Sequence, residues 1–424
     1  MRLAAFALTL TAAAGCHAAP RAGASPASSL SIAEVSRLRR ARQYFELRDR
    51  VARVPEADSA PATLLARAIV AHAMNKPAAS NAVLRRLQAI RGVSDSVVAD
   101  ALELEISNDL RLSDHADGAR AVETLLGGRF LLDTLRAGDA RNSLRIFHAL
   151  AGVAPQTMTT TGATTVALVN GHIPLVVNDS ARDYVFDTGA NLSTIMRSEA
   201  IAVGLRIIPA GLDVGTSTTA RVTADLGIAD SLRIGEMHFH NVVFLVLDDA
   251  MLTFPDGFRI PGIIGFPVIE QMGEIRLGRS SLSVPATPPV RSQQNLVLDE
   301  LTLLTPVQWQ HRPLLCRLDT GAGRTQLYEP FYRRYRATID SGSDTATRKM
   351  GSAGGVQLTP VRVLPNARLV VGDTAASLPT LDVLVHSIAR DESSNYLDCN
   401  LGHDVFDQFG ETIVNFRDMA FLLR

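Results

Sequence analysis

Two aspartates in this chain stand at the head of the same four residues. Asp187 follows the apolar pair Val185 and Phe186 and opens the stretch Asp-Thr-Gly-Ala, and Asp319 opens an identical stretch later in the chain. A carboxylate beside apolar residues is costly unless it is paired or hydrogen-bonded. One Asp-Thr-Gly is acceptable turn chemistry, because glycine supplies a positive φ. Two copies, each extended by the same alanine, indicate instead a pair of working carboxylates.

The chemistry of such a pair follows from electrostatics. Two carboxyl groups about 3 Å apart cannot both ionise cheaply, so they share one proton. The ionised group can take a proton from a bound water while the protonated group polarises a carbonyl. A glycine after the threonine lets the backbone approach the carboxylate and donate hydrogen bonds to it. We therefore predict that Asp187 and Asp319 are catalytic, supported by the loop residues Thr188, Gly189, Ala190, Thr320, Gly321 and Ala322.

The elements that must position these loops also occur twice. Alternating β-branched residues with Asn-Gly-His and Asn-Asp-Ser turn signals predict a strand and a hairpin before Asp187, and residues 301–318 repeat this pattern before Asp319. Each copy closes with an apolar strand that ends in glycine, a short helix and a last hairpin. We predict a duplicated β domain, with copies at 160–284 and 297–424 joined by a Pro-rich linker at 285–296.

Residues 160–424 resemble the pepsin and retropepsin aspartic proteases. In that family each lobe carries an Asp-Thr-Gly loop and a later apolar-apolar-Gly strand end, here residues 263–265 and 400–402. The resemblance implies an all-β, bilobal, pepsin-like domain of closed barrels with a cleft between the lobes. It implies reciprocal hydrogen bonds between Thr188 and Thr320.

The same resemblance implies the activity of an aspartic endopeptidase. Such an enzyme hydrolyses a peptide or protein substrate with a water held between the two aspartates, and it needs no cofactor and no metal. Because one chain carries both loops, we expect a monomer. The alternative from another class is a catalytically silent protease-like fold that binds peptides or envelope proteins. Retention of both aspartates favours the peptidase.

Two residues and both flap candidates differ from the family pattern. Asn400 replaces an apolar residue, and Arg317 stands two residues before the second aspartate, where apolar residues are usual. We interpret both as changes that affect the second lobe's geometry and the substrate pocket more than they affect the dyad. The flap candidates at 215–221 and 351–355 contain Gly and Ser that suit mobility, but neither has the tyrosine of pepsin.

The residue that follows each Asp-Thr-Gly motif allows a prediction of the pH range of activity. In pepsin-like enzymes this residue is often Ser or Thr, whose hydroxyl can donate to the carboxylate and hold its pKa down. Ala190 and Ala322 cannot donate, so we expect the apparent pKa values of the dyad to be higher. The activity maximum should then lie at about pH 5 to 6 and extend towards neutrality.

The cysteines of the second lobe are predicted to pair. Cys316 and Cys399 each lie three residues before a motif residue, Asp319 or Gly402, and the resemblance places their two strands side by side. In an oxidising compartment this implies a disulfide. Two reduced, buried thiols are the alternative.

Residues 1–15 have the pattern of a secretory signal, with Arg2, an apolar run and small residues that lead to Cys16. The apolar run is too short to span a bilayer as a stable helix. Its end, Ala-Ala-Gly-Cys, resembles a bacterial lipoprotein signal, which implies lipidation of Cys16; an ordinary cleaved signal is the alternative. Residues 16–30 would then form the anchor and a flexible tether. His17 stands where an aspartate would indicate retention at the inner membrane, so we expect a periplasmic or outer-membrane lipoprotein, attached to the membrane by this anchor alone.

Residues 31–154 are predicted to be all-α. Ser31 and Glu34 have capping-box spacing, and apolar residues recur at helical intervals between short breaks. Pairs of helices joined by short turns resemble tetratricopeptide-like or other helical-hairpin repeats. We interpret this region as a scaffold or as a binding module for a protein partner.

Composition and the absence of other motifs limit the classes of protein function that remain. A chain of 424 residues with 46% hydrophobic and 20% charged residues is predicted to be globular and multidomain. Its formal net charge of −1 argues against nucleic acid or an anionic membrane surface as a partner. The sequence contains no His-Glu-x-x-His, Cys-x-x-Cys or Gly-x-Ser-x-Gly motif, which argues against the metalloenzymes and serine hydrolases that carry them.

Overall fold

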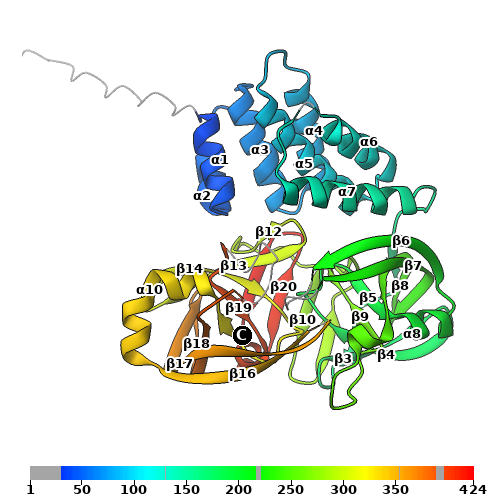
Figure 1. The fold of residues 1–424 in the computed structure, drawn as a ribbon, viewed down its shortest axis with the longest axis vertical. Helices are drawn as coiled ribbons and strands as arrows, with labels where there is room; N and C mark the ends of the chain where they lie inside the picture. The colour runs from blue at the N-terminus through cyan, green and yellow to red at the C-terminus, as the bar shows by residue number, and fades with distance from the viewer. Residues whose placement is uncertain (1–29, 129, 216–220, 353, 388–395) are drawn as a thin grey trace, which may run out of the picture.

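The computed structural model describes residues 30–128, 130–215, 221–352, 354–387 and 396–424. The predicted signal sequence, Cys16 and nearly all of the tether lie outside the described residues. Within these ranges an N-terminal helical region is followed by a β-rich region (Figure 1). No helix in these ranges is long and apolar enough to cross a membrane.

The helical region matches the prediction for residues 31–154 in its helical content. The side-chain oxygen of Ser31 caps the first helix by accepting from the backbone N–H of Glu34 at 3.2 Å. Pro61 and Pro77 begin α3 and α4, where a missing N–H removes no helical bond. The resemblance to tetratricopeptide-like repeats stays a prediction. The helices described here are α1 (Ile32–Arg40), α2 (Tyr44–Val51), α3 (Pro61–Ala73), α4 (Pro77–Gln88), α5 (Asp95–Leu112), α6 (His115–Leu126) and α7 (Thr134–Ala149).

The first lobe is built on an eight-stranded sheet with the order β1-β8-β5-β9-β4-β3-β7-β6. Its two predicted turns are present, because Asn170 and Gly171, and Asn178 and Asp179, all have positive φ. A short helix, α8 (Arg197–Ala202), follows β5, and a 3-10 helix, η1 (Asp249–Leu252), follows β8. The strands are β1 (Thr157–Thr160), β3 (His172–Val177), β4 (Ser180–Phe186), β5 (Ser193–Met196), β6 (Arg206–Gly215), β7 (Arg221–Ile234), β8 (Met237–Leu247) and β9 (Gly262–Ile264).

The second lobe repeats the strand pairing of the first. β4 pairs in parallel with β9, which is antiparallel to β5, and β14 pairs in parallel with β19, which is antiparallel to β15. The duplication seen in the sequence is therefore also a duplication of topology. The strands are β12 (Val297–Asp299), β13 (Thr302–Trp309), β14 (Arg312–Leu318), β15 (Gln326–Leu327), β16 (Asp344–Ser352), β17 (Gly355–Val371), β18 (Thr374–Leu384) and β19 (Cys399–Leu401).

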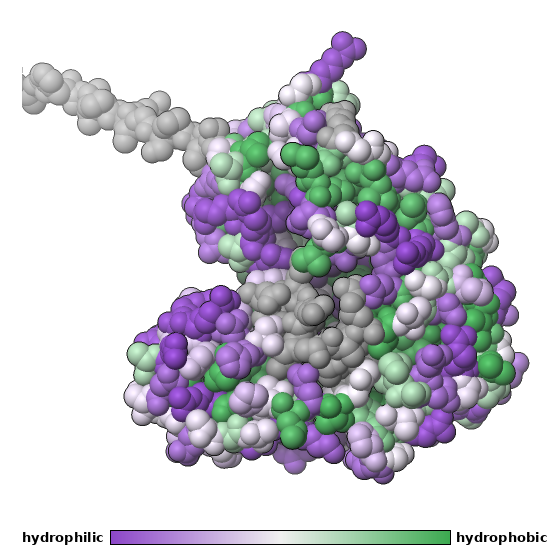
Figure 2. Space-filling model, viewed as in Figure 1, coloured by the Kyte–Doolittle hydropathy of each residue, from purple (hydrophilic) through white to green (hydrophobic). Residues whose placement is uncertain are grey.

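One helix of the second lobe was not predicted. α10 (Glu329–Gly342) follows β15, and its start is marked by Pro330 in the first turn. It buries Phe331 and Ile339 and exposes several arginines, so hydrophilic residues gather over it in Figure 2. The shorter helix α12 (His403–Phe406) follows β19, as α9 (Phe266–Gln271) follows β9.

A five-stranded sheet joins the two lobes, in the order β2-β11-β10-β20-β21. The closing hairpin of each lobe contributes two strands, and β10 pairs with β20 so that Ile275 lies opposite Val414. The sequence predicted both hairpins but not their pairing with each other. The strands are β2 (Thr164–Ala167), β10 (Glu274–Leu277), β11 (Ser281–Val284), β20 (Thr412–Asn415) and β21 (Ala420–Leu423), and residues 285–296, described throughout, contain neither helix nor strand.

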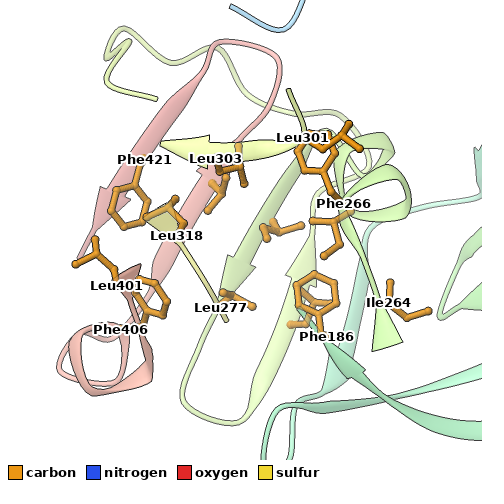
Figure 3. Packing of buried hydrophobic residues seen from close by; sticks show 14 of the residues in the cluster. Phe186, Ile264, Phe266, Leu277, Leu301, Leu303, Leu318, Leu401, Phe406 and Phe421 are labelled. Atoms are coloured by element: carbon orange, nitrogen blue, oxygen red, sulfur yellow. The ribbon is translucent and has the colours of Figure 1, made fainter. Parts of the chain in front are cut away.

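One hydrophobic cluster runs through both lobes beneath the predicted catalytic loops. Figure 3 shows Phe186 and Ile264 of the first lobe, Leu318 and Leu401 of the second, and Leu277 of the shared sheet within it. Burial of these side chains at the ends of four short strands holds the loops that follow them. The core is therefore placed where the site needs rigidity.

The helical region packs against the β-rich region and shares a hydrophobic cluster with its second lobe. At this contact the carboxylate of Asp299 accepts hydrogen bonds from Tyr44, Arg42 and Tyr396. A contact with the first lobe is the ion pair of Arg111 with Glu270 at 2.7 Å. Figure 2 shows that the visible face is hollowed between the helical region and the second lobe.

Candidate active site

The two Asp-Thr-Gly loops meet where β4 and β14 end. The backbone N–H of Asp187 donates to the carbonyl of Ile264 at 3.0 Å, and that of Asp319 donates to the carbonyl of Leu401 at 3.1 Å. Each loop is therefore tied to the end of its parallel neighbour, β9 or β19. The two carboxyl groups lie within hydrogen-bonding reach of each other. The structure thus brings together the two predicted aspartates, one from each lobe.

The two threonines brace the loops against each other. The backbone N–H of Thr188 donates to Oγ1 of Thr320 at 3.0 Å, and the N–H of Thr320 donates to Oγ1 of Thr188 at 3.1 Å. Each hydroxyl then donates to a carbonyl of the opposite lobe, Leu318 at 3.1 Å or Phe186 at 2.8 Å. The predicted reciprocal hydrogen bonds are confirmed. Because both threonines are buried, these bonds fix the distance between the lobes at the dyad.

The glycines allow the close approach on which the dyad depends. The N–H of Gly189 donates to Oδ1 of Asp187 at 2.7 Å. The N–H of Gly321 donates to Oδ1 of both aspartates, at 3.0 Å for Asp319 and 3.2 Å for Asp187. A Cβ on Gly189 would lie 2.6 Å from Cγ of Asp319, and one on Gly321 would lie 2.5 Å from Cγ of Asp187. No larger residue fits without moving the opposite carboxylate.

The alanines end each loop with backbone contacts. The carbonyl of Ala190 accepts from the N–H of Phe266 at 2.8 Å, and that of Ala322 accepts from the N–H of His403 at 2.9 Å. Each alanine thereby ties its loop to the short helix after the closing strand. His403 begins α12, and its Nε2 also contacts the carbonyl of Thr320 at 2.9 Å.

Two hydroxyl residues support the loops but were not predicted. Oγ of Ser193 accepts from the N–H of Gly265, and Oγ1 of Thr325 accepts from the N–H of Gly402, both at 3.0 Å. Thr325 is held in turn by Asp404, which accepts from its N–H at 2.8 Å and from its hydroxyl at 2.6 Å. A signal was available, because each hydroxyl stands six residues after its aspartate.

Arg317 and Asn400, which we interpreted as affecting the second lobe's geometry and the substrate pocket more than the dyad, both contact the dyad directly. Nη2 of Arg317 donates to Oδ2 of Asp319 at 2.7 Å, and Nδ2 of Asn400 donates to the same oxygen at 2.9 Å. Arg317 and Asp319 lie two residues apart, so they project to the same face of the chain. Asn400 reaches that face because β14 and β19 pair in parallel with Arg317 opposite Asn400. Both departures from the family pattern therefore contact a predicted catalytic residue.

The two carboxyl groups have opposite pKa shifts. Burial and the charge of Asp319 raise the pKa of Asp187 to about 7. Burial would also raise the pKa of Asp319, but the Arg317 guanidinium and the hydrogen bond from Asn400 outweigh it and hold that pKa below its usual range. The expectation that the alanines give the dyad higher apparent pKa values than those of pepsin-like enzymes stays a prediction. It did not take into account the two donors at Asp319, which act in the opposite direction on that group.

The flap candidates fall partly outside the described residues. Residues 216–220 and residue 353 are not among them. The strands that lead to them form the hairpins β6–β7 and β16–β17. The N–H of Gly354 donates to the carbonyl of Met251 in η1 at 2.9 Å, so the second lobe's hairpin contacts the first lobe.

The predicted disulfide between Cys316 and Cys399 is confirmed. The two residues lie directly opposite each other in the parallel pair of β14 and β19, with a Cα–Cα distance of 4.5 Å. The bond therefore joins the strand that carries Arg317 to the strand that carries Asn400. Among the residues that the structure describes, no three His, Cys, Asp or Glu side chains gather as metal ligands.

Comparison with known proteins gives a family for part of the chain. The family model described as aspartyl protease matches residues 173–268, which span the first lobe from β3 to α9 and include Asp187. A crystal structure of a retropepsin-like aspartic protease from Rickettsia conorii aligns at 18% identity with a TM-score of 0.21, covering 31% of this chain and 97% of that chain. No curated protein sequence matches the chain.

Proposed function

We propose, from the premise that residues 173–268 are an aspartyl protease family domain, that the chain is an aspartic endopeptidase. Its active site would lie between the two lobes of one chain, in a pepsin-like arrangement of two closed barrels, with Asp187 and Asp319 as the catalytic pair. The observation that carries this proposal is the contact of the two carboxyl groups across the reciprocal threonine bonds. The family implies peptide substrates.

The chemistry balances with these two groups and one water. The water oxygen bonds to the scissile carbonyl carbon while one of its protons passes to the ionised carboxylate and the protonated carboxyl gives its proton to the carbonyl oxygen. The C–N bond of the resulting diol then breaks. The leaving nitrogen takes the proton gained from water, and the other carboxylate recovers a proton from a diol hydroxyl. The dyad ends as it began, without a cofactor or a metal.

The test is cleavage of a peptide library by the purified full chain. We expect cleavage by the parent protein and none by Asp187→Asn or Asp319→Asn. Full activity in either variant would overturn the proposal. Peptide binding without cleavage by the parent protein would instead favour the alternative, a silent protease-like fold that binds peptides or envelope proteins.

We also propose that the mature chain is a monomer anchored by a lipid at Cys16, in the periplasm or at the outer membrane. The support is the signal-like sequence before Cys16 and the presence of both Asp loops in one chain. The helical region would then serve as a scaffold or bind a protein partner. Cys16→Ser should move the protein from the membrane fraction to the soluble fraction. A variant that still pellets with membranes would rule out the anchor.

A further inference from the structure

We propose that Arg317 and Asn400 are positioning residues that make the dyad unequal: they hold Asp319 as the ionised carboxylate and leave the shared proton on Asp187. This inference rests on the proposed function, since it assigns the two roles within the same site. Asp319 would then be the base that takes the proton from water. Asp187 would be the acid that polarises the scissile carbonyl.

The first support is the count of donors at each carboxylate. Oδ2 of Asp319 accepts from Arg317 at 2.7 Å and from Asn400 at 2.9 Å, and its Oδ1 accepts from the N–H of Gly321 at 3.0 Å. The hydrogen bonds found at Asp187 come from two backbone N–H groups, those of Gly189 and Gly321. Hydrogen bonds and a positive charge favour the ionised form of the carboxyl group that receives them.

The second support is an internal comparison between the lobes. Val185 stands two residues before Asp187 as Arg317 stands two before Asp319, and Val185 pairs with Ile263 as Arg317 pairs with Asn400. The first lobe thus has an apolar pair at the two positions where the second lobe has a cation and an amide. The topology is duplicated, but the polarity is not. The asymmetry of the dyad is therefore encoded by two side chains.

The third support is burial. The side chains of Arg317 and Asp319 are 14% and 9% exposed, so water screens their interaction only weakly. Nε of Arg317 and Oδ1 of Asn400 are buried without a hydrogen-bond partner among the described residues. Such unpaired atoms are unfavourable for folding. Their presence here fits a pair of residues kept for its effect on Asp319 rather than for stability.

The charged and titratable groups around Asp319 come from several elements. Asp187 faces it from the loop after β4, and Arg317 faces it from β14. Tyr328, which precedes α10, interacts electrostatically with Arg317. His403 of α12 contacts the carbonyl of Thr320, the residue that follows Asp319. Arg317 is the cation that forms an ion pair with the carboxylate of Asp319. The pKa of Asp319 is lowered despite its burial, which agrees with this arrangement.

The experiment compares Arg317→Val and Asn400→Ile with the parent chain. These substitutions copy the apolar pair of the first lobe, with Val in the place of Val185 and Ile in the place of Ile263. Two readouts are measured across pH: kcat/KM on a library-derived peptide, and the carboxyl ¹³C shifts of labelled aspartate, assigned with Asp187→Asn and Asp319→Asn. Arg317→Val should move the acid limb of the rate profile, and the titration of Asp319, to higher pH by at least about one unit. Asn400→Ile should move both in the same direction by less, because the amide is a neutral donor.

Controls separate charge from packing. Arg317→Lys keeps the positive charge, so both pH midpoints should stay close to those of the parent chain. Arg182→Val makes the same substitution at the start of β4, where Arg182 pairs with Glu199 of α8, and should leave both pH midpoints unchanged. If Arg317→Val does not fold, Asn400→Ile still tests the direction of the shift.

The outcomes distinguish the inference from the proposed function. Cleavage with an unchanged acid limb and an unchanged Asp319 titration in both Arg317→Val and Asn400→Ile would overturn the inference and leave the peptidase standing. No cleavage by the parent chain, with Asp319 titrating below Asp187 and shifting in Arg317→Val, would support the unequal dyad and remove the peptidase. Titration of Asp187 below Asp319 in the parent chain would overturn the inference directly.

Discussion

At the scale of residues, the two members of the dyad should differ in their effect on stability. Asp187 keeps its proton in the folded state up to about pH 7, whereas an unfolded aspartate loses it at about pH 4. The folded state therefore binds more protons between these values, and the contribution of Asp187 to stability falls as pH rises through this window. Asp187→Asn removes this titrating group. The free energy of unfolding of the variant, measured relative to that of the parent chain, should therefore be higher at pH 7 than at pH 4 by about 1 to 3 kcal/mol.

Asp319→Asn should have the opposite effect. Its lowered pKa contributes stability that is present above the unfolded value and is lost as pH falls through the folded one. Loss of the carboxylate also removes the charged partner of Arg317, so we expect a loss of about 1 to 3 kcal/mol at pH 7. Urea unfolding of both variants at the two pH values measures these changes. Equal shifts of the same sign would contradict the opposite surroundings of the two groups.

The pH profile of the parent chain follows from the same two groups. Cleavage needs Asp319 ionised and Asp187 protonated, so kcat/KM should fall below the lowered pKa of Asp319 and above the raised pKa of Asp187, which is about 7. The profile should then be a broad plateau that includes the expected maximum at about pH 5 to 6. A basic limb below about pH 5 would contradict the raised pKa of Asp187.

Much of this residue-scale picture could be predicted from the sequence, but not all of it. The aspartates, threonines and glycines were found because their motif occurs twice. Ser193 and Thr325 could have been found from their shared spacing. The contact of Arg317 could also have been found, because it stands two residues before Asp319 and projects to the same face of the chain. The contact of Asn400 could not, because it depends on which residue of β19 lies opposite which residue of β14. Strand register is a tertiary property, and without it Asn400 looks like a flaw in an apolar strand.

At the scale of elements, the ends of the closing strands tolerate no side chain. A Cβ on Gly265 would lie 2.5 Å from the carbonyl carbon of Leu192, and one on Gly402 would lie 2.6 Å from the carbonyl oxygen of Ala322. Both obstacles are backbone, so each Gly→Ala substitution should displace an Asp loop. We expect a loss of about 1 to 3 kcal/mol in stability and a severe loss of activity. Gly342→Ala is the control, because no atom lies within 4 Å of its added Cβ. Thermal unfolding and peptide cleavage of the three variants test the prediction.

The disulfide should stabilise β14 and β19, the strands that carry Arg317 and Asn400. It closes a loop of 83 residues, so replacing both cysteines by alanine should lower stability by about 2 to 4 kcal/mol. Mass spectrometry of unreduced peptides should recover Cys316 linked to Cys399. Two free thiols, or an unfolding midpoint that does not respond to a reductant, would show that the bond does not form in solution.

At the scale of the whole molecule, the sequence predicted the order of the regions but not how they pack. Helical periodicity and β alternation are local signals, and both regions appeared where those signals predicted them. The pairing of β10 with β20 and the contact of the helical region with the second lobe join segments far apart in the chain. Nothing in the periodicity of Val297, Leu304 or Leu384 shows that their neighbours are helices.

Because of that contact, the β-rich region should depend on the helical region for stability. Leu304, Val361 and Leu384 of the second lobe are 0 to 2% exposed in a cluster with helical residues such as Leu47 and Leu65. Removal of residues 1–153 would expose this apolar surface to water, at about 25 cal/mol for each Å² uncovered, and would favour aggregation.

We expect the fragment 154–424 to unfold at a lower temperature than the full chain and to lose solubility. Asp299→Ala tests the same interface in the intact protein, since Tyr44 and Arg42 of the helical region and Tyr396 of the second lobe all donate to this carboxylate. It should speed proteolysis of residues 150–156, which link α7 to β1. Asp49→Ala, which removes an exposed partner of Arg48 within α2, is the matched control and should leave proteolysis unchanged. A fragment as stable as the full chain would mean that the helical region is an independent body, because a shared core cannot be halved without a loss of stability.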